Sequence, residues 1–356
     1  MIYPWLERPF KRFVERGWEL PHGVLLTGPK GIGKLVFIAD IARSLLCTTA
    51  ENGPGCKECQ GCHLFGAGSH PDYHFLTNEW TVETGDPALV TPGERYLVQA
   101  DGRTRDRTKP KRVIGVSQAR ALTEELRSTS HYSAGKVIVI YPADQLNVNA
   151  ANALLKVLEE PTPNTQFLLV AEALYALPAT IRSRCSHFRL PMPAEDDALA
   201  WVQEKLLLDR KESRQLLHFA GGSPLEACEL FEGEAWRTGT GLAADLAAIL
   251  SGNTTPMSIS KKWSQGDVRM TVRWLQRQML GGFRAGLGAD PAETSLQLYE
   301  GLGRDRCLSL YERTGAFLQW PPKAVDEVLF LESIILSLFE SGHVDGKIRV
   351  RDRGVA

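Results

Sequence analysis

The chain has 356 residues, 43% of them hydrophobic, which is enough for two or three domains with sizeable cores. It carries 41 lysine and arginine residues against 42 aspartate and glutamate residues, a net charge of -1. This balance excludes a globally basic nucleic-acid-binding protein, although a local basic face is still compatible with it. No apolar run reaches the roughly 20 residues of a membrane span, and the first residues lack a signal-peptide pattern. We therefore expect a soluble cytoplasmic protein.

Strand and helix signals alternate through the first half of the chain. Strands are expected at 23–27, 73–76, 137–140 and 167–170, and helices at 35–46, 117–130 and 148–160. This alternation predicts an α/β fold in which helices cover a parallel sheet. The polar segment 78–112 is broken by glycines and prolines, so we expect a loop or a weak hairpin there and assign it no role.

Strand signals stop after Pro193. Helices at 194–207, 213–220 and 225–232 form a small helical module, and 239–341 reads as further helices separated by Gly252, Gly266, Gly281-Gly282 and Pro321-Pro322. We expect an α/β domain over 1–192, the helical module over 193–238, an all-helical domain over 239–341 and a disordered tail over 342–356.

A phosphate-binding loop lies between the first expected strand and helix. Residues 28–34 match the pattern G-x-x-x-x-G-K in the strand–loop–helix context that makes this motif credible. The candidate phosphate ligands are the backbone around Gly28, Gly31 and Gly33, and the side chain of Lys34. The next position normally carries a hydroxyl that ligates magnesium, but here it is Leu35.

A second defect follows the strand at 137–140, where an ATPase needs an acidic pair for the magnesium shell and the attacking water. The chain has Tyr141 and Pro142 there, and Asp144 is best explained as a turn or helix-cap residue. The joint loss predicts almost no hydrolysis, while nucleotide binding by the loop stays open. The alternative is a self-sufficient P-loop ATPase that uses Lys34 with Asp144 as a displaced acid.

Four cysteines with the spacing C-x8-C-x2-C-x2-C follow the first helix: Cys47, Cys56, Cys59 and Cys62. Four thiolates make a closed tetrahedral zinc site, which is structural. An iron–sulfur cluster, or a coincidental set of free cysteines, is the competing interpretation. His63 or His70 would be a substitute ligand. A zinc-dependent DNA-binding module is a further alternative, disfavoured by the neutral charge and the closed position of the cluster.

Two features stand out in the helical C-terminal region. Arg269, Arg273 and Arg277 form a basic stripe at helical spacing, which we interpret as a solvated face rather than a DNA or partner contact. Residues 327–339 are apolar nearly all round, so this helix is expected to be buried.

Several motifs together resemble a known family. They are Tyr3-Pro4-Trp5-Leu6, the degraded phosphate loop, the four cysteines, His70-Pro71-Asp72-Tyr73, the run from Asn152 to Pro161, and Ser183-Arg184-Cys185. Over residues 1–230 the chain resembles bacterial clamp-loader subunits of the AAA+ class, most closely the delta-prime family of the DNA polymerase III holoenzyme. The resemblance implies an AAA+ P-loop domain, a helical lid over 193–238 and a helical collar over 239–341.

The resemblance also implies a role for Arg184. In that family the arginine of Ser-Arg-Cys acts in trans, as an arginine finger on ATP held with magnesium by an adjacent motor subunit, gamma or tau. This chain departs from the motor subunits at Leu35, Tyr141 and Pro142, and again at 171–172 and Leu225, where sensor residues would stand. Alternatively, Arg184 pairs with a core carboxylate or caps a helix.

The implied partners are the gamma/tau and delta subunits, the sliding clamp and primed DNA, contacted through backbone and shape. The helix at 327–339 would then pack against related helices of other subunits. We expect an accessory subunit that is not an enzyme on its own, with structural zinc and with ATP and magnesium on the neighbour.

Overall fold

The computed structural model describes residues 2–49, 54–99, 110–126, 135–172, 174–233, 235–251, 253–288, 293–320 and 325–339. The chain divides into two compact units, Met1–Ala198 and Leu199–Ala356, each with its own hydrophobic core. The expected tail at 342–356 lies outside the described residues. Within the described part of the chain, no helix has both the length and the apolar composition needed to cross a membrane.

A parallel five-stranded sheet is the centre of the first unit. Its strands are β1 (Gly23–Thr27), β2 (Tyr73–Leu76), β3 (Lys136–Ile140), β4 (Thr165–Ala171) and β5 (Ser186–Arg189), in the order β2-β3-β4-β1-β5. The first four are buried along their whole length, as expected for a parallel sheet covered on both faces. The sheet and the all-helical C-terminal part confirm the predicted fold class. The short strand β5, at one edge, was not predicted.

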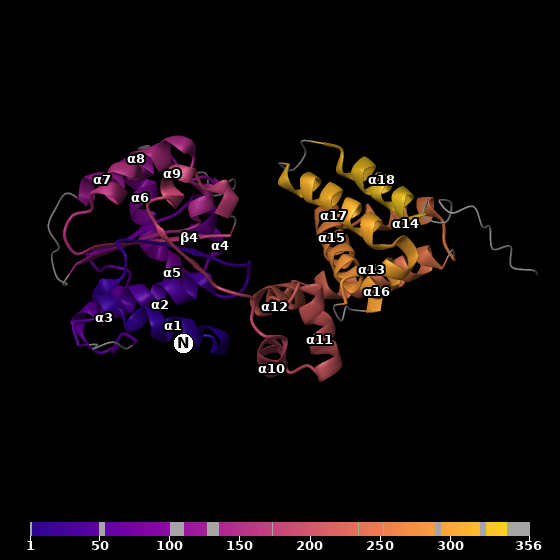
Figure 1. The fold of residues 1–356 in the computed structure, drawn as a ribbon, viewed down its shortest axis with the longest axis horizontal. Coiled ribbons are helices and arrows are strands. Elements are labelled where there is room, and N and C mark those ends of the chain that lie inside the picture. The colour runs from indigo at the N-terminus through magenta and orange to yellow at the C-terminus, as the bar shows by residue number, and fades with distance from the viewer. Residues whose placement is uncertain are drawn as a thin grey trace, which may run out of the picture. The chain divides into compact units, whose positions relative to one another are not determined.

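Helices cover both faces of this sheet (Figure 1). One face carries α1 (Glu7–Val14), α2 (Lys34–Leu46) and α3 (Gln60–Gly66), and the other carries α7 (Val116–Glu125), α8 (Val148–Glu159) and the short α9 (Ala179–Arg182). Side chains alternate between the faces along a strand. Val24 and Leu26 therefore join the core beneath α1 and α2, whereas Leu25 joins the core beneath α7 and α8.

The prediction of a loop or hairpin at 78–112 was wrong for residues 79–99. They form α4 (Glu79–Thr84), α5 (Pro87–Val90), the 3₁₀ turn Thr91–Gly93 and α6 (Glu94–Gln99); residues 100–109 lie outside the described part. Asn78 caps α4 by accepting the Thr81 N–H at 2.8 Å, and Asp86 caps α5 by accepting the Ala88 N–H at 3.0 Å. The polar residues and prolines in this segment mark helix starts. The sequence did not reveal the helices because they are too short to show an apolar period.

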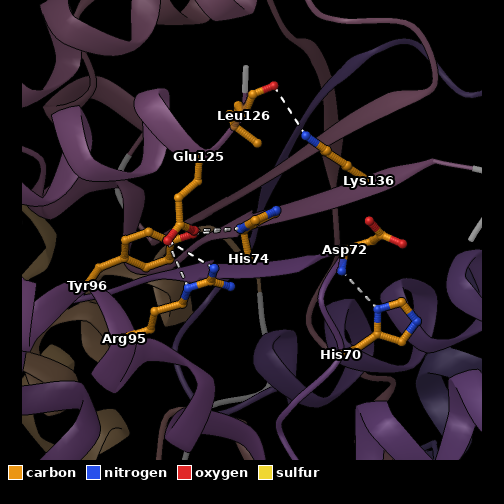
Figure 2. A network of polar contacts seen from close by, with 8 residues as sticks. All are labelled: His70, Asp72, His74, Arg95, Tyr96, Glu125, Leu126 and Lys136. Atoms are coloured by element: carbon orange, nitrogen blue, oxygen red, sulfur yellow. Dashed lines mark hydrogen bonds and ion pairs between the residues drawn. The ribbon is translucent and has the colours of Figure 1, made fainter. Parts of the chain in front are cut away.

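A buried polar network holds α6 against the sheet (Figure 2). Tyr96 is fully buried, and its hydroxyl donates to Glu125 Oε2 at 2.7 Å and lies 2.6 Å from His74 Nδ1 on β2. Arg95 pairs with the other oxygen of Glu125 at 2.9 Å. The carboxylate at the end of α7 thus links α6 to the central sheet.

The second unit is helical. Its helices are α11 (Arg210–Phe219), α12 (Pro224–Glu232), α13 (Ala235–Leu250), α14 (Pro256–Trp263), α15 (Val268–Ala285), α16 (Glu293–Leu302), α17 (Arg304–Gln319) and α18 (Glu327–Phe339), while α10 (Glu195–Leu206) spans the division. The expected break at Gly281-Gly282 is wrong, since α15 runs through both residues. A Cβ on Gly281 would lie 2.4 Å from Ser295 Oγ, and one on Gly282 3.0 Å from Cys307 Sγ. The glycines let α16 and α17 approach α15.

The basic stripe on α15 is not the solvated face that we predicted. Arg269 donates to Glu327 Oε1 at 3.1 Å and to the Trp320 carbonyl at 2.8 Å. Arg277 pairs with Glu226 and donates to the Phe219 carbonyl at 2.7 Å. Of the three arginines, only Arg273 is exposed. Two of the three therefore stabilise the helical unit from within.

Helix α18 is buried on one side only. Leu331, Ile334 and Leu338 lie in the core, but Leu329 is 62% exposed and Leu336 is 50% exposed. The sequence left two interpretations open, burial within this chain and packing against other subunits, and the exposed leucines contradict complete burial within this chain. An apolar face with two leucines at i and i+7 remains on the surface of the unit.

Candidate functional site

The phosphate loop connects β1 to α2, and its lysine is turned onto the loop itself. Lys34 Nζ donates to the carbonyls of Gly28 at 2.8 Å and Pro29 at 2.6 Å, and the residue is only 5% exposed. Burial lowers the pKa of Lys34, while Glu172, 3.7 Å away, and Asp144 act in the opposite direction. The ammonium group that would reach a phosphate is thus already bound by its own chain.

Two aromatic residues near the N-terminus lie against the loop. Trp5 Nε1 donates to the Ile32 carbonyl at 2.9 Å, and the Tyr3 and Trp5 rings stack with centroids 5.1 Å apart. Gly33 has φ +89°, and a Cβ there would lie 2.5 Å from the Tyr3 ring. Only glycine fits this position, both for its backbone angle and for its contact with Tyr3. The sequence motif contained both aromatic residues, but nothing in it predicted this contact.

The positions that should ligate magnesium are apolar and packed. Leu35 and Tyr141 are partly buried against the core cluster beneath α1 and α2. Asp144 lies in a 3₁₀ turn, Ala143–Gln145, close enough to Lys34 to influence its pKa. A carboxylate therefore remains near the lysine, but the hydroxyl and the acidic pair are absent from the sequence.

The four cysteines come together around the end of α2 and the start of α3. Cys47 follows the last residue of α2, and Cys59 caps α3. All four sulfur atoms lie within 4.8 Å of one another; the Cys47–Cys59 separation is 3.7 Å and the Cys56–Cys62 separation is 4.0 Å. A tetrahedral zinc ion with bonds of about 2.3 Å needs sulfur atoms about 3.8 Å apart. The donor set therefore fits a closed tetrahedral metal site.

Backbone N–H groups surround the sulfur atoms in a way that favours thiolates. The Cys59 N–H lies 3.2 Å from Cys56 Sγ, and the Cys62 N–H lies 3.4 Å from Cys59 Sγ. Burial acts to raise the pKa of Cys59, but hydrogen bonds from Thr48 and Cys62 outweigh it and lower the pKa to about 5. Cys62 is the exception: burial raises its pKa to about 12, so this thiol keeps its proton until a bound cation displaces it.

The histidines considered as substitute ligands are not part of this cluster. Among the described residues, the group that could hold a metal ion consists of the four cysteines alone. His63 is exposed, and His70 is buried with its Nδ1 accepting the Asp72 N–H at 3.1 Å.

Arg184 lies between α9 and β5, and its guanidinium contacts its own chain. Nε donates to Glu159 Oε1 at 2.7 Å, Nη2 pairs with the same oxygen, and Nη1 donates to the Thr180 carbonyl at 2.8 Å. Glu159 is the last residue of α8. It stands in the motif from Asn152 to Pro161, yet sequence reasoning did not pair it with Arg184. The carboxylate is 46% exposed, so the pair is not a core ion pair.

The structure does not bring Arg184 and the phosphate loop of the same chain together. The Arg184 carbonyl lies 3.0 Å from a Cβ built on Gly23, at the start of β1, whereas the loop begins at Gly28, after the end of β1. A strand rises about 3.3 Å per residue, so the two backbones are about 16 Å apart along β1. The arginine therefore lies near the amino ends of the strands, whereas its own loop lies at their carboxyl ends.

Comparisons with known proteins show the family of the chain. A family described as "DNA polymerase III, delta subunit" matches residues 7–194. The chain is 30% identical over 290 residues to DNA polymerase III subunit delta' of Escherichia coli (strain K12), covering 81% of this chain and 78% of that protein. It is 31% identical over 290 residues to the protein of the same name in Pseudomonas aeruginosa, covering 81% and 79%. The chain belongs to the delta' family.

Membership of the delta' family confirms the resemblance drawn from the sequence motifs. Among solved structures, a gamma subunit-related protein of Thermotoga maritima aligns over 94% of this chain and 98% of its own. Its TM-score of 0.40 and identity of 14% are too low to support a functional inference.

Proposed function

We propose that this delta' family member is a subunit of the DNA polymerase III clamp loader that does not itself hydrolyse ATP. Its Arg184 acts as an arginine finger in trans and completes the ATP site of a neighbouring motor subunit. An arginine supplied from outside stabilises the charge that develops on the transferring phosphate. The chain thereby couples ATP hydrolysis by the neighbouring subunit to loading of the sliding clamp on primed DNA during replication.

The observation that carries this proposal is the separation of Arg184 from its own phosphate loop. An arginine about 16 Å along β1 from the loop cannot serve nucleotide bound there. The Arg184 side chain is 29% exposed, which makes it accessible to another subunit. The packed Leu35 and Tyr141 support the absence of hydrolysis in this chain.

The partners are those of the family: the gamma/tau motor subunits, the delta subunit, the clamp and primed DNA, in the cytoplasm. The exposed apolar face of α18, with Leu329 and Leu336, supports packing in a helical collar. ATP and magnesium belong to the neighbouring motor subunit. The proposal does not require nucleotide on this chain, where Lys34 is bound to carbonyls of its own loop.

The metal is proposed to be one structural zinc ion, held by Cys47, Cys56, Cys59 and Cys62. Zinc would fix the end of α2 against the start of α3 and would have no open position for substrate. Its contribution is to folding, because a closed thiolate site stabilises only the folded chain.

The experiment combines two measurements on the purified chain. Copurification with gamma/tau and delta subunits, together with ATP turnover of the complex that depends on this chain, supports the proposal. Steady-state ATP turnover by the chain alone, lost in Lys34→Ala, would support the alternative of a self-sufficient ATPase that uses Lys34 with Asp144. The proximity of Asp144 to Lys34 is the observation that keeps this alternative worth testing.

A further inference from the structure

The guanidinium of Arg184 makes hydrogen bonds within its own chain through all three nitrogen atoms. Nε and Nη2 both donate to Glu159 Oε1. Nη1 donates to the Thr180 carbonyl at 2.8 Å and lies 3.3 Å from Ser183 Oγ. A guanidinium has five N–H groups, so these contacts use four and leave one, on Nη2.

This arrangement leaves no pair of donors for an incoming phosphate. An arginine grips a carboxylate or phosphate through two parallel N–H groups on one edge of its plane. Glu159 covers the edge formed by Nε and Nη2, and Thr180 covers Nη1, which the other edge needs. A neighbour's ATP can therefore engage Arg184 with both donors only if Glu159 gives way.

We propose that Glu159 is a positioning residue that latches Arg184 to its own subunit until the phosphates of the neighbour's ATP displace the carboxylate. This inference rests on the proposed trans role of Arg184. The latch would hold the arginine back while the neighbouring site is empty or not yet closed. It would thereby lower ATP turnover in the absence of clamp and DNA.

The exposure of the pair makes it suited to exchange. The Arg184 side chain is 29% exposed and the Glu159 side chain 46% exposed, so water screens their attraction. Exposed ion pairs of this kind shift a population by only about 1.5- to 5-fold. Glu159 also ends α8, where the helix dipole disfavours a carboxylate and favours a cation. A phosphate carrying more charge than one carboxylate can displace such a partner.

The test uses the fully assembled clamp loader, rebuilt with Glu159→Gln and measured for ATP turnover with and without clamp and primed DNA. Gln keeps the size of the side chain but removes the charge. Glu160→Gln is the matched control, since Glu160 is the next residue, is exposed, and makes no contact with Arg184 among the described hydrogen bonds and ion pairs. Arg184→Ala, alone and with Glu159→Gln, completes the set.

The latch predicts a basal turnover about 1.5- to 5-fold higher in Glu159→Gln, with the stimulated turnover unchanged, so that the stimulation ratio falls. The increase should disappear in the Arg184→Ala background, which a merely structural role of Glu159 would not produce. If Arg184→Ala lowers stimulated turnover but Glu159→Gln leaves basal turnover unchanged or lowers it, the latch is wrong and the trans role stands. If Arg184→Ala has no effect, both proposals fail.

Discussion

The buried histidine His74 should make the α/β unit less stable as the pH falls. It is only 3% exposed, and its Nδ1 lies 2.6 Å from the hydroxyl of Tyr96 (Figure 2). Because that hydroxyl donates its hydrogen to Glu125, Nδ1 of His74 must carry a hydrogen and donate to the Tyr96 oxygen. Glu125 Oε2 also lies 3.4 Å from Nδ1, but a second proton would sit on Nε2, which is buried and has no hydrogen-bond partner among the described residues, so the neutral ring is favoured.

The size of the loss in folding stability follows from the pKa of His74. Burial, and then the charge of Arg95, lowers the pKa of His74 from 6.5 to about 3. Between these values the unfolded chain binds a proton that the folded chain does not. The stabilisation is complete above about pH 6.5 and is lost as the pH falls toward 3. At about pH 5 the loss is about 2 kcal/mol, and at about pH 4 it is about 3 kcal/mol.

The assay compares wild type with His74→Asn in urea at pH 8 and pH 5. Hydrogen exchange in β2 and β3 gives the free energy of unfolding of the first unit separately from the helical unit. Asn places an N–H donor near the Nδ1 position but does not titrate. The variant should be less stable at pH 8, with a deficit about 2 kcal/mol smaller at pH 5.

The cysteine thiols are the same in wild type and His74→Asn, so their response to acid cancels in the difference between the two free energies of unfolding. His187→Asn, on the exposed strand β5, is the control for loss of a histidine as such. A stability difference between wild type and His74→Asn that is the same at both pH values would refute the reasoning.

Three further predictions concern the metal, the helical unit and the nucleotide. Cys59→Ser should lower the zinc content below one atom per chain and lower the melting temperature, without abolishing any catalytic activity. Iron, or no metal in fresh wild-type protein, would count against a zinc site. Gly281→Ala should destabilise the helical unit by up to about 2 kcal/mol in urea unfolding, because overpacking against Ser295 costs about 1–3 kcal/mol and exceeds a gain of about 1 kcal/mol in helix propensity. Gly241→Ala, with nothing within 4 Å, should stabilise it instead. The purified chain should show no ATP turnover in a coupled assay, and turnover abolished by Lys34→Ala would contradict this expectation.

Most of the central sheet could be predicted from the sequence. Strands β1 to β4 are predominantly apolar because parallel strands are buried on both faces, and a glycine or proline stands within two residues of each start. Strand β5 was not predicted because three of its four residues are exposed, and its pairing with β1 decides its conformation. The four-cysteine cluster was also predictable, since ligand spacing is local and metal chemistry restricts it.

The missed features depend on contacts between distant segments. The glycines at 281–282 signal a break by propensity, but close approach of neighbouring helices explains them better. The pairing of Arg269 with Glu327 spans 58 residues, and that of Arg184 with Glu159 spans 25. Side-chain partners of this kind follow from the packing of whole elements, which a sequence pattern does not encode.

The most direct test of the account is ATP turnover of the assembled clamp loader carrying Arg184→Ala, measured with clamp and primed DNA after assembly is verified by size. The account predicts an intact complex in which the ATP site completed by Arg184 loses about three orders of magnitude in turnover. Arg184→Lys should rescue poorly, because lysine keeps the charge but lacks the planar fork. Normal turnover and normal clamp loading by a fully assembled Arg184→Ala complex would contradict the central claim and leave Arg184 with only structural contacts, to Glu159 and Thr180.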